Sequence, residues 1–113
     1  MEVKREIVLP SEPEEVWSAL TEAERLEEWF ATDVELDPVP GGEGVFRWGD
    51  GEERHALVKE VEPERRFAFT WEESRVVIEL EPVKEGTRLV VTETLGSGWG
   101  TALELRALAL VHA

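Results

Sequence analysis

Apolar and polar side chains alternate along most of this chain, from residue 32 to residue 95. A period of two is typical of strands that bury one face. Turns rich in glycine or proline divide this part into six predicted strands, and residues 3–9 predict one more strand before them. Because the links have hairpin length, we expect an antiparallel meander. The six predicted strands comprise residues 34–36, 44–48, 53–61, 67–71, 76–82 and 87–95.

Residues 11–30 show a helical period instead. The segment from Ser11 to Glu14 has the form of a capping box with Ser11 as the N-cap, and Thr21 to Glu24 has the same form. We therefore expect two short helices, the second beginning at Thr21. Apolar residues at core spacing in these helices are Val16, Trp17, Leu20, Leu26, Trp29 and Phe30.

The end of the chain, residues 98–113, predicts a helix that is apolar nearly all round. Trp99 and Leu103 lie on one side, and Leu105 and Leu108 lie roughly opposite. Such a helix must be covered by a curved sheet, a bound apolar ligand, a second chain or a combination of these. We expect the sheet to cover the Trp99 side, and a homodimer to cover Leu105 and Leu108.

The predicted fold class is therefore α+β. A seven-stranded curved antiparallel sheet wraps around a C-terminal helix, and two short helices lie between the first and second strands. The chain has 113 residues, enough for one domain, which we place at residues 1–113.

Composition excludes several classes of function. The net charge of −14 disfavours binding to nucleic acid or to anionic membranes. The chain has no cysteine for disulfides or thiolate metal sites. No secretory signal and no apolar run of about 18 residues is present, so a cytoplasmic location is expected. Asparagine and glutamine are absent and glutamate is abundant, a pattern typical of thermophile proteins.

Several segments, taken in order, carry a family resemblance. They are Pro13 to Thr21, Trp29-Phe30, Gly41-Gly42, Val61 to Phe67, Phe69 to Glu72, Gly86 to Leu89, and Gly98-Trp99 before Leu103. Together they resemble the START-like, or SRPBCC, helix-grip superfamily, and within it the branch named for activators of the heat-shock-protein-90 ATPase. The chain departs from that pattern in the very short link before its last helix and in the early end of that helix.

The resemblance implies a cavity between the last helix and the concave face of the sheet. The shared faces of the predicted strands support the same lining independently. Plain hydrophobic core is the alternative, and a space below about 300 Å³ would leave little room for a drug-sized ligand. The candidate lining residues are Phe46, Trp48, Phe67, Phe69, Trp71, Val76, Ile78, Leu89, Val91, Glu93, Trp99 and Leu103.

Arg5 and Glu93 are the sharpest polar candidates, because each shares a strand face with apolar residues. A charge that faces inward is costly unless it is paired. The first and seventh strands are neighbours in the implied topology, so we hypothesise that the two side chains pair across them. A register shifted by one residue would instead turn either of them to solvent.

His55 is the third polar candidate, but it is interpreted as structural or exposed. No cysteine exists, and no triad or nucleophile-elbow spacing surrounds a serine. The second histidine, His112, is explained by its place near a helix C-terminus. Two separate histidines offer no metal-binding spacing, so neither a metal nor a cofactor is predicted.

Three functions remain open at this point. The first is non-catalytic binding of a small hydrophobic or amphipathic molecule in the cavity. The second is a protein-interaction module, with a chaperone partner implied by the resemblance alone. The third is an enzyme similar to the polyketide cyclases and aromatases, for which Arg5, Glu93 and His55 are the only polar candidates.

Overall fold

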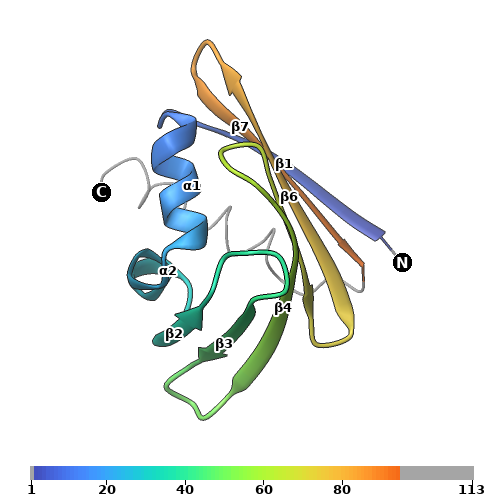
Figure 1. Ribbon diagram of the computed structural model, residues 1–113. Helices are drawn as coiled ribbons and strands as arrows, with labels where there is room; N and C mark the ends of the chain where they lie inside the picture. Colours follow the sequence, from blue (N-terminus) through green and yellow to red (C-terminus); the bar gives the residue numbers. More distant parts are fainter. Residues whose placement is uncertain (1, 95–113) are drawn as a thin grey trace.

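Seven strands form one antiparallel sheet in the order β1-β7-β6-β5-β4-β3-β2 (Figure 1). The computed structural model describes residues 2–94, so the predicted helix at residues 98–113 lies outside the described residues. The α+β architecture with two short helices after the first strand is confirmed. The elements are β1 (Glu2–Leu9), α1 (Pro13–Thr21), α2 (Ala23–Trp29), β2 (Asp33–Leu36), β3 (Glu43–Arg47), β4 (Glu53–Glu62), β5 (Arg66–Trp71), β6 (Ser74–Val83) and β7 (Gly86–Thr94).

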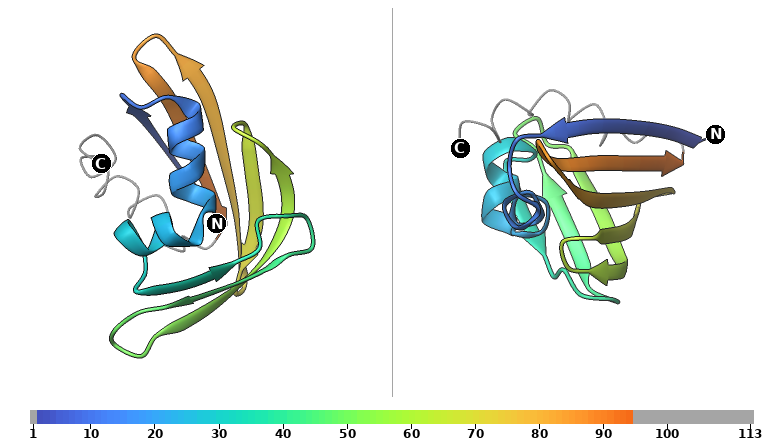
Figure 2. Two further views of the ribbon diagram at one scale, coloured as in Figure 1. Left: turned by 60° about the vertical axis from the view of Figure 1, so that its left-hand side comes forward. Right: turned by 90° about the horizontal axis from the view of Figure 1, so that it is seen from above.

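The sheet curves, and both helices lie on its concave side (Figures 1 and 2). Strands β2 to β7 follow one another as a meander, whereas β1 pairs with β7 along its whole length, from Glu2 opposite Thr94 to Leu9 opposite Thr87. The predicted neighbourhood of the first and seventh strands is therefore correct. Because β1 and β2 form opposite edges of the described sheet, the chain between them crosses the concave face as α1 and α2.

The predicted N-cap of α1 is wrong. Glu12 occupies the N-cap with an extended backbone, and no side chain caps the helix. Extended geometry is what a residue before proline prefers, and Pro13 starts the helix without losing a hydrogen bond. Ser11 lies one residue earlier, where its carbonyl accepts a hydrogen bond of 2.8 Å from the Thr87 hydroxyl of β7. The junction of β1 and α1 is thus tied to the neighbouring strand.

The start predicted for α2 is also wrong by two residues. Thr21 belongs to the last turn of α1, where its hydroxyl donates to the Trp17 carbonyl at 2.8 Å. Glu22 is extended and separates the two helices, and α2 then begins at Ala23. The Thr21 hydroxyl therefore bonds a carbonyl in the last turn of α1 and does not cap α2. Serine and threonine side chains commonly bond a nearby backbone group in this way instead of capping a helix.

The core lies between the helices and the concave face. Leu20 of α1 and Leu26 of α2 are fully buried there, together with the inward residues of β3 to β7. The indole Nε1 of Trp29 donates to the Ala19 carbonyl at 2.8 Å, which joins the end of α2 to α1 in the buried interior. This bond satisfies a polar group that would be costly to bury alone.

The convex face is polar and is organised by cross-strand ion pairs. Arg47 on β3 bonds Asp33, Glu35 and Glu53 at 2.9, 2.8 and 2.9 Å. Arg66 bonds Glu60 and Glu79, and Arg88 bonds Glu81 and lies 3.5 Å from Glu6. An antiparallel sheet with one solvated face commonly has this division, in which opposite charges face each other across the strands.

Replacing Gly86 with alanine should destabilise the protein far more than the same change at Gly51. Both glycines have positive φ, but a Cβ at Gly86 would lie 2.1 Å from the Leu9 carbonyl oxygen, whereas at Gly51 it would meet nothing within 4 Å. We expect losses of at least about 3 kcal/mol for Gly86→Ala and about 1 kcal/mol for Gly51→Ala in chemical denaturation. Equal losses would contradict the close approach of β7 to the end of β1.

Candidate functional site on the concave face

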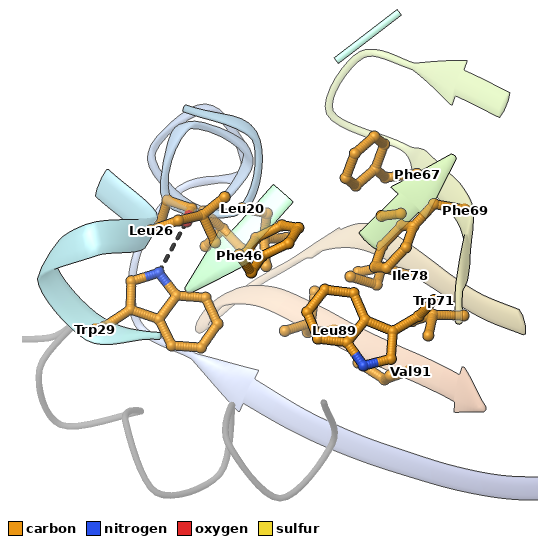
Figure 3. Packing of buried hydrophobic residues seen from close by; sticks show 14 of the residues in the cluster. Leu20, Leu26, Trp29, Phe46, Phe67, Phe69, Trp71, Ile78, Leu89 and Val91 are labelled. Carbon is orange, nitrogen blue, oxygen red and sulfur yellow. Dashed lines mark hydrogen bonds between the residues drawn. The ribbon is translucent and has the colours of Figure 1, made fainter. Parts of the chain in front are cut away.

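The predicted lining residues that the structure describes lie on the concave face. Figure 3 shows Phe46, Phe67, Phe69, Trp71, Ile78, Leu89 and Val91 among them. Their strands alternate inward and outward, so every second residue of β3, β5, β6 and β7 faces the helices. Trp99 and Leu103 lie outside the described residues. Trp48 is half-buried, and those at most 2% exposed are Phe46, Phe67, Phe69, Trp71, Val76, Ile78, Leu89, Val91 and Glu93.

Aromatic rings dominate the β3 and β5 side of this face. The Phe46 and Trp71 rings have centroids 4.7 Å apart in an edge-to-face arrangement. Phe69 lies 6.3 Å from Trp71 and 5.2 Å from Phe67, so the three aromatics of β5 continue the same cluster. Tilted and edge-to-face pairs are the geometry that aromatic quadrupoles favour.

Phe30 extends this cluster to the surface. It follows α2 and is half-buried, and its ring lies 5.6 Å from that of Trp48 and 5.8 Å from that of Trp71. The indole Nε1 of Trp48 donates to the Phe30 carbonyl at 2.9 Å and so fixes the two residues against each other. The sequence predicted Phe30 only as an apolar core residue of the second helix, without its contacts to the strands. Periodicity identifies an inward helix residue but does not say which strands it will reach.

The interior bounded by described residues has little free space. An apolar gap lies between Leu20 and the concave face, and it is too narrow to admit a water molecule. Ordinary ligand pockets have at least about 300 Å³. Side chains therefore fill this part of the predicted cavity. The lining of this space is Leu20, Leu36, Phe46, Ala56, Phe67 and Phe69.

A larger open groove borders the exposed end of the aromatic cluster. It has a volume of about 420 Å³, and we call it the α2 groove. Its floor includes the half-buried Phe30 and Trp48, and the exposed Glu27 and Glu28 stand on its edge. The lining residues that the structure describes include no lysine or arginine and are Glu27, Glu28, Trp29, Phe30, Ala31, Thr32 and Trp48.

Arg5 and Glu93 share the inward-facing side of β1 and β7 but differ in exposure. Val3 stands opposite Glu93 and Arg5 opposite Val91, so Arg5 and Glu93 are diagonal neighbours. Glu93 is 2% exposed, whereas Arg5 is exposed. A diagonal neighbour is within reach of a long side chain. Their pairing stays a prediction, because the ion pairs between described residues do not include this one.

His55 lies on the other side of the sheet. It is opposite Val45, one residue out of phase with the buried Phe46, and its side chain is 61% exposed. Its Nε2 lies 3.8 Å from a carboxylate oxygen of Glu53. His55 is therefore separated by the sheet from the concave face and from the other two polar candidates.

Two further properties of the described residues concern metal sites and membrane-spanning helices. Among residues 2–94, no group of three or more histidine, aspartate or glutamate side chains comes together as a metal site would require. Neither α1 nor α2 has the length and apolar character that crossing a bilayer demands.

Comparisons with solved structures show the same fold. Protein MLL2253 from Mesorhizobium loti has a TM-score of 0.87 at 22% identity, covering 99% of this chain and 97% of that one. Protein NE0264 from Nitrosomonas europaea has a TM-score of 0.82 at 25% identity, covering 99% and 94%. The Aha1 dimer from Colwellia psychrerythraea has a TM-score of 0.84 at 20% identity, covering 100% and 95%.

A search among curated proteins found no match. The family model described as "Activator of Hsp90 ATPase homolog 1-like protein" matches residues 10–109, which is most of the chain. This match agrees with the sequence segments that resemble the START-like superfamily and with the fold of the solved relatives. The chain therefore belongs to the family of Activator of Hsp90 ATPase homolog 1-like proteins, within the START-like superfamily.

Proposed function

We propose that this protein is a non-catalytic module that binds a small apolar or amphipathic molecule against the concave face of its sheet. The observation that carries the proposal is the aromatic cluster, which runs without interruption from buried Phe69 and Trp71 to half-buried Phe30 and Trp48. Concave apolar surfaces with few polar groups are the usual sites of small ligands.

The free volumes favour entry through the α2 groove. The groove is open to solvent and has about 420 Å³, whereas the apolar gap beside Leu20 does not admit a water molecule. A ligand would rest mainly in the groove, with its apolar end against Phe30 and Trp48. The remaining predicted lining, including Glu93, Trp99 and Leu103, would complete the site toward the C-terminal segment.

The cyclase-like alternative receives less support from this arrangement. A general acid or base must come within hydrogen-bond reach of the substrate, directly or through one water. His55 lies across the sheet from the aromatic cluster, and Arg5 is exposed. Of the three polar candidates, only Glu93 is buried on the concave face.

A second candidate function is a protein-interaction module. The family is named for activators of the Hsp90 ATPase, and the solution structure from Colwellia psychrerythraea is that of a dimer. By this reading the chain forms a homodimer through Leu105 and Leu108, and a chaperone is a further partner. The predicted apolar side of residues 98–113 supports the homodimer.

Binding of 1-decanol, followed by isothermal titration calorimetry, tests the first proposal. We expect Trp48→Leu to weaken binding about fivefold, since it removes an aromatic contact of the groove. The matched control is Leu57→Ala, which changes an apolar side chain that is 37% exposed and lies beside His55 on the convex face. Absence of decanol binding to the unaltered protein, with no ligand carried through purification in native mass spectrometry, would overturn the proposal.

The homodimer is tested by light scattering after size-exclusion chromatography at micromolar concentration. The unaltered chain should elute as a dimer and Leu105→Glu as a monomer, because a buried charge would disfavour an apolar contact. Glu104→Gln, a change on the same predicted helix, should leave the dimer intact. A monomeric unaltered chain that tolerates Leu105→Glu would contradict the interface.

The Arg5–Glu93 pair is tested by a double-mutant cycle with Arg5→Met and Glu93→Gln. If the arginine reaches across the β1–β7 diagonal, the free energies of unfolding should be coupled by about 0.5 kcal/mol or more. Urea denaturation of the four proteins measures this coupling. Strictly additive changes would show that the two charges act independently.

A further inference from the structure

The α2 groove combines two features that together indicate the charge of its ligand. Its floor carries the rings of Phe30 and Trp48, set at 72° to each other with centroids 5.6 Å apart. Its edge carries the carboxylates of Glu27 and Glu28. Aromatic faces flanked by acidic groups attract cations, and Trp is the strongest of the aromatic residues in this respect.

The hydrogen bonds around the groove keep its floor in place. The indole Nε1 of Trp48 is held by the Phe30 carbonyl at 2.9 Å, so the ring that faces the groove does not depend on a ligand for its position. Glu27 uses one carboxylate oxygen, Oε2, to accept the backbone N–H of Val34 at 2.9 Å. That bond anchors the acid next to the start of β2 while its side chain remains at the groove edge.

Arg25 is the described cation near this edge, and it is shared between Glu28 of the edge and Glu15. Arg25 lies 3.4 Å from Glu28 but only 2.5 Å from Glu15, so its main partner is on α1. The hydrogen bond that Arg25 donates to the Glu15 carboxylate is also the largest cause of the raised pKa of Arg25. Since none of the lining residues within residues 2–94 is basic, the described lining is negatively charged, in agreement with the net charge of −14.

We propose that the α2 groove selects amphipathic molecules with a cationic head group, of which a single-chain alkylammonium is the simplest. The head group lies between the Trp48 ring and the Glu27 and Glu28 carboxylates, and the alkyl chain lies along the Phe30 side of the groove. The inference rests on the proposed function and adds the charge of the ligand to it. An anionic amphiphile such as a fatty acid or alkyl sulfate would meet like charges at the same edge.

Three probes with the same alkyl chain test the proposal by isothermal titration calorimetry below their micelle concentrations. They are decyltrimethylammonium, decyl sulfate and 1-decanol. We expect the cation to bind at least about tenfold more tightly than the sulfate at physiological ionic strength. Decanol isolates the apolar contribution, so it reports on the proposed function without reporting on the charge preference.

Two matched double variants distinguish the effect of the groove carboxylates from the effect of the protein's overall charge. Glu27→Gln with Glu28→Gln removes the groove carboxylates and keeps an acceptor for the Val34 N–H. Glu62→Gln with Glu85→Gln removes the same charge from exposed positions outside the groove lining. We expect the first pair to reduce the preference for the cation over the sulfate about fivefold or more, and the second to leave it within about twofold. Thermal unfolding confirms that both remain folded.

The outcomes distinguish the two proposals. Decanol binding with equal affinities for cation and sulfate would overturn the cationic selectivity and leave the proposed function standing. Equal effects of the two double variants would assign the preference to overall charge and would also overturn the groove as its source. Failure of all three probes to bind would overturn both proposals.

Discussion

Pairing of β1 with β7 is the interaction on which the rest of this structure depends. It joins the start of the chain to the last strand of the meander over eight residue pairs, from Glu2–Thr94 to Leu9–Thr87. Because β1 thereby occupies the edge opposite β2, the connecting helices must cross the concave face. The hydrogen bond from Thr87 to Ser11 and the close approach of Gly86 to Leu9 lie where the chain leaves β1 for α1. Backbone contact at this junction sets the direction in which α1 enters the core.

The two faces of the sheet then follow different physical rules. On the convex face, arginines such as Arg47 and Arg66 are each shared between carboxylates of neighbouring strands. Exposed pairs of this kind individually add little stability, but they prevent like charges from facing each other across strands. On the concave face, burial of aromatic and aliphatic side chains supplies the main driving force for folding. Glu93 lies on the described part of this face, and this charged residue is only 2% exposed.

Period-two alternation predicted the faces of the strands well, because a side chain's face depends only on its position in the strand. Phe46, Phe69 and Val91 therefore lie where the pattern put them. Helix starts were less predictable. Ser11 and Thr21 have side chains that can cap a helix or bond a nearby backbone group, and the choice depends on tertiary neighbours. The role of Phe30 could not be predicted either, since its contact with Trp71 joins α2 to a strand 41 residues further along the chain.

The distribution of arginine explains why a cation would be recognised at the α2 groove and not across the whole acidic surface. Carboxylates of the convex face such as Glu35 and Glu79 already bond arginines, so a further cation there would compete with a strong, geometrically matched partner. At the groove, Glu27 and Glu28 stand beside apolar rings that screen charge less than open water does. An amphiphile gains apolar contact and charge contact together in this place. Selectivity then arises from the juxtaposition of the aromatic floor with Glu27, which bonds none of the described arginines, and with Glu28, which Arg25 contacts at 3.4 Å. A net charge alone would not create this arrangement.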